Sequence, residues 1–201
     1  KYYVTLNREV LMSRERGFDF ADVYFGGGTP TVMLDELVDF VNFLRKNFNI
    51  RQISMESTPR EINPECVRRL QEIGVNRLSI GVQSFDESVL KATGRASMSA
   101  AESREKLLLA QGNFDTLNLD LIFNFPSQTP ENFRRDVETF KSMGIDQVTF
   151  YPLMPSPHKM NALERRFRSV DTSRELEFYN IILSEIFDAG FQASTAWGFS
   201  R

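Results

Sequence analysis

Three consecutive glycines are the residues of this chain with the clearest capacity to bind a ligand. Gly26, Gly27 and Gly28 follow an apolar run and precede Thr29 and Pro30. Without Cβ atoms, this stretch lets a ligand approach the backbone and lets the chain turn with positive φ. A turn that only reverses the chain is the alternative. The spacing matches neither the G-x-G-x-x-G dinucleotide motif nor the Gly-Lys-Ser/Thr of a P-loop, so we expect a ligand other than a pyrophosphate.

Polar residues also occur at or near the ends of three apolar runs. Glu56 ends one run, Gln83 follows a second, and Asp120 lies inside a third, between two leucines. A carboxylate in that last position is costly to bury unless something donates hydrogen bonds to it. Each residue has an ordinary interpretation as well: a solvated carboxylate for Glu56, a turn residue for Gln83 and a partner of some buried donor for Asp120. Arg95 follows Gly94 and is either a surface charge or a ligand contact.

Short β-like runs alternate with helical patterns along the chain, and capping residues mark several helix starts. One helix should begin after Asn63, and two capping boxes are expected, Ser99 with Glu102 and Thr172 with Glu175. The expected strands cover residues 21–25, 53–56, 78–82, 117–125 and 147–152.

Strands alternating with helices indicate an α/β fold built from βα units around a parallel sheet. A complete eight-unit barrel needs about 250 residues, and this chain has 201, so we expect a partial barrel or an open sheet. In both architectures, ligands bind at the carboxyl ends of the strands. The glycine turn, Glu56, Gln83 and Asp120 should therefore converge at one edge of the sheet.

The composition excludes several classes of function. Hydrophobic residues make up 41% of the chain and charged residues 25%, and the net charge is −3, which favours a soluble globular protein without a basic surface for nucleic acid. No apolar run approaches the roughly 18 residues of a membrane span, and no signal peptide begins the chain, so we expect a cytoplasmic location. The single cysteine excludes an internal disulfide and any multi-cysteine metal site within these residues, and the single histidine, His158, leaves one candidate at most for a His-based catalytic group.

Four segments together carry a resemblance to a known family. They are YFGGGTPT at residues 24–31, GVNRLSIGVQSFD at 74–86, LKATGR at 90–95 and DLIFNFPSQT at 120–129. In order and spacing, the chain resembles the radical S-adenosylmethionine (SAM) proteins related to oxygen-independent coproporphyrinogen III oxidase, a family that includes haem chaperones. The resemblance implies a partial (β/α)6 barrel with parallel strands, whose first strand would lie upstream of Lys1. It also implies a barrel core over residues 1–155, followed over 156–201 by the last helix and the start of a truncated C-terminal region.

The resemblance further implies a SAM site made by seven residues: Gly27, Gly28, Thr29, Glu56, Gln83, Arg95 and Asp120. The glycine turn would present backbone groups to the amino end of the methionine moiety, and Glu56 would help to anchor its ammonium. Arg95 would pair with the methionine carboxylate, and Gln83 and Asp120 would bind the ribose hydroxyls. The backbone near Met154 would contact adenine.

The cluster-binding motif of the family, Cys-x3-Cys-x2-Cys, is absent from these residues. In the family this motif binds a [4Fe-4S] cluster and lies ahead of the first helix, so here it would fall just before Lys1. Either the chain is a fragment or it comes from a relative without a cluster. Cys66, on a predicted helix, is expected to be a core residue rather than a ligand.

Three functions follow as expectations from the resemblance. The first is a radical SAM enzyme that takes an electron from a donor, cleaves SAM at the cluster and starts radical chemistry on a tetrapyrrole-like small molecule. The second is a haem chaperone of the same family, and the third is a non-catalytic relative without a cluster. The arginines of residues 164–168 would suit the propionates of a tetrapyrrole, although such a run is also typical of a solvated helix face.

Overall fold

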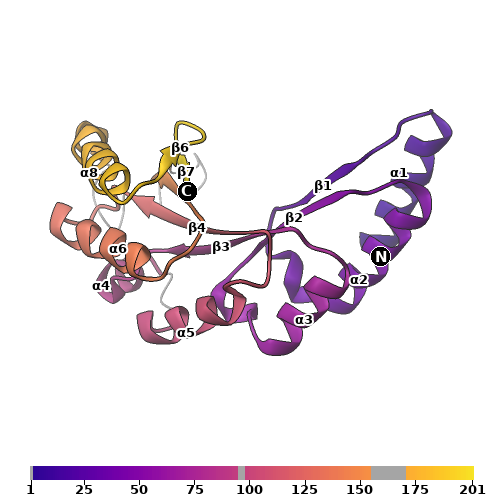
Figure 1. Ribbon diagram of the computed structural model, residues 1–201, viewed down its shortest axis with the longest axis horizontal. Coiled ribbons are helices and arrows are strands. Elements are labelled where there is room, and N and C mark those ends of the chain that lie inside the picture. The colour runs from indigo at the N-terminus through magenta and orange to yellow at the C-terminus, as the bar shows by residue number, and fades with distance from the viewer. Residues whose placement is uncertain (1, 95–97, 155–170) are drawn as a thin grey trace.

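The computed structural model describes residues 2–94, 98–154 and 171–201, which form one curved sheet with helices along its outer side (Figure 1). The strands are β1 (Asp22–Phe25), β2 (Gln52–Ser57), β3 (Arg77–Gln83), β4 (Thr116–Phe123), β5 (Gln147–Pro152), β6 (Gln192–Ala193) and β7 (Gly198–Ser200). The α-helices are α1 (Tyr2–Glu15), α2 (Leu34–Asn47), α3 (Pro64–Glu72), α4 (Glu87–Ala92), α5 (Ala100–Ala110), α6 (Pro130–Ser142) and α8 (Glu175–Asp188). Short 3-10 helices cover Pro30–Met33, Pro59–Glu61 and Thr172–Arg174.

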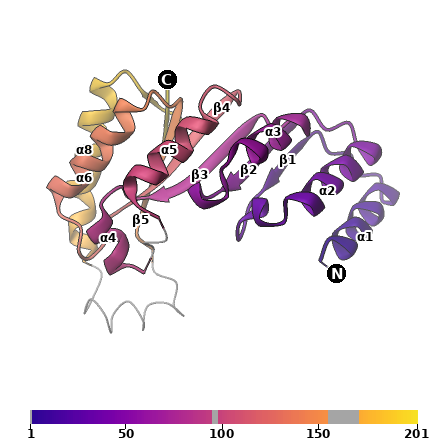
Figure 2. The ribbon, with the colours of Figure 1, turned by 90° about the horizontal axis from the view of Figure 1, so that it is seen from below.

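The strand order follows the order of the chain through the first five strands. The sheet runs β1-β2-β3-β4-β5-β7-β6, and β1 to β5 pair in parallel with their sequence neighbours. Each parallel connection passes through a helix on the same side, and Figure 2 shows these helices side by side in front of the strands. The expected α/β fold with a parallel, barrel-like sheet is therefore confirmed, and the described loops that follow β1 to β4 lie at one edge of it.

Two details of the sequence prediction were wrong, and one element was not predicted. β4 ends two residues early because Asn124 takes a left-handed conformation, with φ of 66°. Asp171, not Thr172, caps the start of the 3-10 helix by accepting from the Ser173 amide at 3.0 Å, and no side chain caps α8 itself. The unpredicted element is the antiparallel pair β6 and β7, which adds to β5 and is too short to show a strand period.

The core lies between the outer face of the sheet and the helices. Apolar strand residues such as Leu78 and Leu119 are fully buried there, against helix residues such as Leu70 and Phe133. Cys66 belongs to this core as expected: only 1% of its surface is exposed, and burial raises the pKa of its thiol to about 11.

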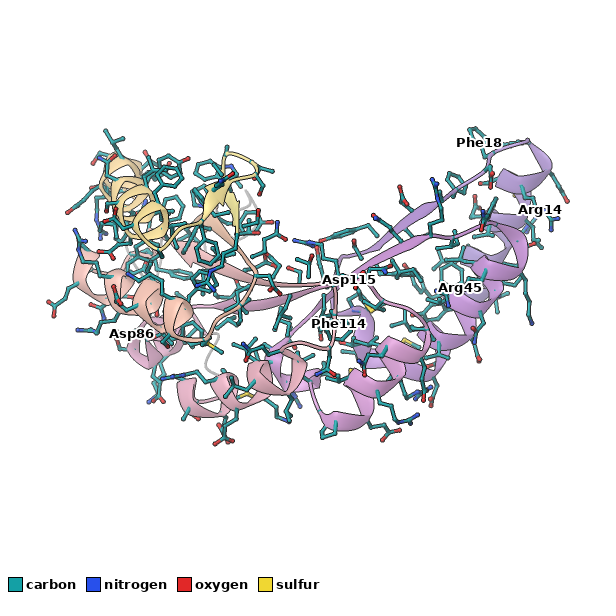
Figure 3. The ribbon with its side chains drawn as sticks, viewed as in Figure 1. Arg14, Phe18, Arg45, Asp86, Phe114 and Asp115 are labelled. Atoms are coloured by element: carbon teal, nitrogen blue, oxygen red, sulfur yellow. The ribbon has the colours of Figure 1, made fainter. Side chains whose placement is uncertain are left out.

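A buried carboxylate on α6 fastens the loop after β3 to the loop after β4. Asp136 accepts from the Ser84 hydroxyl and the Phe85 amide, each at 2.7 Å, and from the Gln128 side chain at 3.5 Å. The neighbouring Asp86 begins α4, on the side that faces α6 (Figure 3). Burial raises the pKa of Asp136 to about 6, and its hydrogen bonds offset only part of that effect.

The raised pKa of Asp136 predicts how the free energy of unfolding changes with pH. The folded state binds the Asp136 proton more tightly than the unfolded chain does. Protonation of Asp136 therefore stabilises the fold fully below the unfolded pKa of 3.8, and this stabilisation is lost as pH rises through about 6. Asp136→Asn cannot titrate. The free energy of unfolding of the natural chain should therefore fall relative to that of the variant by about 2–3 kcal/mol between pH 4 and pH 7.

Urea titrations at several pH values measure this difference, and carboxylates common to both proteins cancel in it. Asp39→Asn, at an exposed position of α2, is the matched control and should show no such trend. A constant difference between the natural chain and Asp136→Asn across this pH range would contradict the prediction.

Candidate functional site

The face of the sheet that the helices leave open, which we call the inner face, is polar. Glu56, Ser79, Asn118 and Gln147 come from four neighbouring strands and share one register across them. Alternation along each strand places these polar residues on one side and the buried leucines and isoleucines on the other. Figure 3 shows side chains projecting from the strands on the open side.

Asp120 is the centre of a hydrogen-bond network on the inner face. Its carboxylate accepts from the Ser79 hydroxyl at 2.7 Å and from the Asn118 amide at 2.9 Å. Asn118 also donates to Ser79 at 2.7 Å and accepts from Thr149 at 3.1 Å. Burial raises the pKa of Asp120, while the two hydrogen bonds and the charge of Arg77 lower it in part.

Asp120 has the hydrogen-bond donors that its position between two leucines requires, as its ordinary interpretation expects. Asp120 does not need a ligand to supply its donors, because Ser79 and Asn118 already provide two. A carboxylate oxygen accepts more than one hydrogen bond, so these contacts leave Asp120 able to bind a further hydroxyl. The network instead fixes the orientation of the carboxylate before any ligand arrives.

Glu56 is bound to a tyrosine from the edge strand. The Tyr24 hydroxyl donates to Glu56 Oε1 at 2.6 Å, and burial together with this bond raises the pKa of Tyr24. The pair also explains why the first residue of the turn, Gly26, has no side chain. A Cβ on Gly26 would lie 2.8 Å from the Tyr24 ring and 3.2 Å from Glu56 Oε1, so a side chain there would displace one of them.

The other two glycines of the turn differ from each other. Gly27 has φ of +101°, a conformation that side chains of L-residues rarely adopt, so the backbone itself requires a glycine. Gly28 lacks this constraint, and a Cβ added to it would meet no described atom within 4 Å, so nothing in the described segments accounts for it. Gly28 and Thr29 line a pocket of about 230 Å³, and the Thr31 hydroxyl fastens the turn to Ser57 at 2.8 Å.

Gln83 lies at the end of β3 in a strained conformation. Its φ is 74°, and its side-chain amide folds over Gly81, where a Cβ would lie 2.7 Å from Nε2. Among the described residues this amide has no hydrogen-bond partner. Gly81, Gln83, Gly94 and Met98 line a pocket of about 280 Å³. A strained residue with an unused polar group beside a pocket is typical of a binding position.

The structure thus brings six of the seven predicted site residues to the carboxyl edge of the sheet. Gly27, Gly28 and Thr29 follow β1, Glu56 lies near the end of β2, Gln83 ends β3, and Asp120 lies in the carboxyl half of β4.

Arg95 falls outside the described residues, although Gly94 and Met98, which flank its segment, line the pocket beside Gln83. The arginines of residues 164–168 are also outside them. Met154 is described, and 73% of its surface is exposed.

Three inner-face residues contribute to the site and were missed in the sequence. Ser79, Asn118 and Tyr24 hold the two carboxylates through hydrogen bonds. A polar residue at every second position of β3 and β4 was the available signal, because period-two polarity within an apolar strand marks a second solvated face.

No group of three or more His, Cys, Asp or Glu residues suited to a metal ion occurs within residues 2–94, 98–154 and 171–201. No helix of these same segments is long and apolar enough to cross a membrane.

The contrast between the glycines gives a testable prediction. Gly27→Ala should lower the free energy of unfolding by about 1–2 kcal/mol, because alanine is strained at this positive φ. Gly28→Ala should change it by no more than about 0.5 kcal/mol, because the position is open and its backbone is ordinary. Urea denaturation of both variants measures this, and equal losses would show that Gly28 has a role within the fold.

Known proteins resemble this chain in sequence. The sequence profile of the Radical SAM superfamily matches residues 5–155. The chain is 30% identical over 207 residues to the oxygen-independent coproporphyrinogen III oxidase of Pseudomonas aeruginosa, covering 95% of this chain and 44% of that protein. It is 28% identical over 176 residues to the heme chaperone HemW of Bacillus subtilis, covering 84% of this chain and 46% of that protein.

A solved structure gives the same result for the fold. The coproporphyrinogen III oxidase of Escherichia coli, described as a radical SAM enzyme, matches the whole chain with a TM-score of 0.88 and 26% identity. The chain spans somewhat less than half the length of these relatives, 48% in the case of that structure. Because the profile covers most of its residues, the chain belongs to the radical SAM superfamily.

Proposed function

We propose that the carboxyl edge of the sheet binds SAM and that the chain is the barrel portion of a radical SAM enzyme acting on a tetrapyrrole. The observation that carries the proposal is Gly28. It lines a pocket whose other walls include Leu6 of α1 and Phe40 of α2, its φ is not positive, and no described atom lies within 4 Å of the position that a Cβ would take. A ligand lying against the bare backbone is the physical reason for a glycine there.

The neighbouring side chains suit the separate parts of SAM. In the proposal, the glycine turn and Glu56 bind the methionine ammonium, and Arg95 pairs with the methionine carboxylate. The side-chain amide of Gln83 and the pre-oriented carboxylate of Asp120 bind the ribose hydroxyls. Acidic groups are appropriate here because SAM carries a positive sulfonium as well as the ammonium.

The superfamily also implies a [4Fe-4S] cluster, which supplies the electron for reductive cleavage of SAM. The one cysteine of these 201 residues is buried in the core on α3, so the thiolate ligands of such a cluster do not come from this stretch. We therefore assign to the chain's own residues only the binding and orientation of SAM and the exclusion of water around it.

A tetrapyrrole substrate is proposed because the relatives that match nearly all of this chain are named for coproporphyrinogen. The heme chaperone relatives favour a second function, haem binding and delivery, at the same inner face. The two differ in their dependence on SAM. Two results together would favour the chaperone. Haem would bind with equal affinity with and without SAM, and the chain, supplied with the cluster-bearing part of the protein, would not cleave SAM.

SAM titration by calorimetry tests the proposed site. Gly28→Val should weaken binding at least about tenfold while leaving stability unchanged, because its side chain would occupy the ligand's space. Arg95→Ala should weaken binding about ten- to a hundredfold, the worth of one charge-assisted hydrogen bond. Arg104→Ala, at an exposed position of α5, is the control and should bind like the natural chain. Equal affinities in all four proteins would remove this site from the proposal.

A further inference from the structure

Arg77 is the only Lys, Arg or His in the seven strands that the structure describes. It begins β3, it is half-buried, and its position in the strand alternation places it on the inner face. Burial raises the pKa values of Tyr24, Asp120 and Tyr151, and the positive charge of Arg77 offsets part of each rise. The guanidinium therefore faces the same space as these groups.

The guanidinium of Arg77 is held at one of its three nitrogens. Its Nε donates to Gln147 Oε1, from β5, at 3.0 Å. Among the described residues, its two Nη groups have no hydrogen-bond partner, and Arg77 forms no ion pair with any described carboxylate. The two acidic groups nearby are bound elsewhere, Glu56 to Tyr24 and Asp120 to Ser79 and Asn118.

This arrangement resembles a prepared anion site more than a structural ion pair. A guanidinium offers its two Nη groups as a planar fork that matches the two oxygens of a carboxylate. Fixing Nε with Gln147 reduces the rotamer entropy lost when the fork binds. Tyr24 and Tyr151, residues that are 58% and 41% exposed, add two hydroxyl groups to the inner face.

We propose that the Nη fork of Arg77 binds one carboxylate of the substrate on the inner face of the sheet. This inference rests on the proposed function for the class of substrate, a tetrapyrrole that carries propionates. It assigns to Arg77 the recognition of one acidic side chain of that substrate, at a position removed from the glycine turn that is proposed to bind SAM. The same contact would serve haem, which also carries propionates, if the chain is a chaperone.

The alternative is that Arg77 only offsets the negative charge of Glu56 and Asp120. The two roles differ in their dependence on the ligand's acid groups. A contact with a carboxylate is lost when that carboxylate is esterified, whereas a general effect on the charge or shape of the inner face acts on the acid and on its ester alike.

The experiment is a fluorescence titration of the 201-residue chain with coproporphyrin III and with its tetramethyl ester. We expect Arg77→Met to weaken binding of the acid at least about tenfold, the worth of one hydrogen-bonded ion pair. Binding of the ester should be the same for Arg77→Met and the natural chain. Arg77→Lys should recover part of the loss because it keeps the charge without the fork, and Arg104→Met should behave like the natural chain.

The other outcomes separate the two proposals. If Arg77→Met binds the acid as tightly as the natural chain does, or loses acid and ester equally, the assignment of Arg77 is wrong and the tetrapyrrole proposal stands. If the natural chain binds neither probe, the proposed substrate class fails and the Arg77 assignment fails with it. Urea denaturation of each variant shows that it is folded, and Gln147→Ala, which removes only the brace on Nε, should weaken acid binding less than Arg77→Met.

Discussion

Parallel pairing of each strand with its neighbour in sequence is the constraint on which the rest of this structure depends. It requires a helix after each of the first four strands, and all of these helices lie on one side, where they bury the apolar half of every strand. The other half is left free to be polar. The same pairing places the loops that follow β1 to β4 at one edge, so residues far apart in sequence become neighbours there.

The polar face and the edge are stabilised by contacts within the chain, and the side chains that we propose to bind SAM are thereby oriented in advance. Ser79 and Asn118 hold Asp120, and Tyr24 holds Glu56. Behind them, a third carboxylate reaches from α6 to join the loops after β3 and β4. Buried carboxylates are costly in an apolar environment. Asp136 is buried, and Asp120 and Glu56 are half-buried. Each one is met by hydrogen-bond donors, so it also fixes the position of the backbone that carries the site.

Local signals in the sequence were sufficient for most elements. The Asn63 cap and the capping box of Ser99 and Glu102 are both present, because each depends on residues within one turn of a helix. The apolar runs placed Gln83 at the end of one strand and Asp120 inside another, and the structure has Gln83 as the last residue of β3 and Asp120 within β4. The hydrophobic period of the strands and the spacing of the glycines and polar residues indicated only that some ligand would bind at the carboxyl edge of the sheet.

Contacts between distant segments could not be predicted in the same way. Asp136 bonds to the Phe85 amide across 51 positions of the chain, and the pairing of β7 with β5 brings the end of the chain beside a strand that precedes α8. The failed capping box at Thr172 has a local cause, since Asp171 is the stronger acceptor one residue earlier. The free Nη fork of Arg77, on which its proposed role depends, is also a matter of distant contacts, since Gln147 holds Nε from 70 positions away.

The central claim is that SAM binds at the carboxyl edge of the sheet, against the glycine turn. Amide hydrogen exchange of the natural chain, measured with and without SAM, tests this claim most directly because it reports on each loop separately. The account predicts slower exchange in residues 26–29 and 81–84 and unchanged exchange in the outer helices α3 and α5. Unchanged exchange at the glycine turn, or protection confined to the helical side, would contradict it.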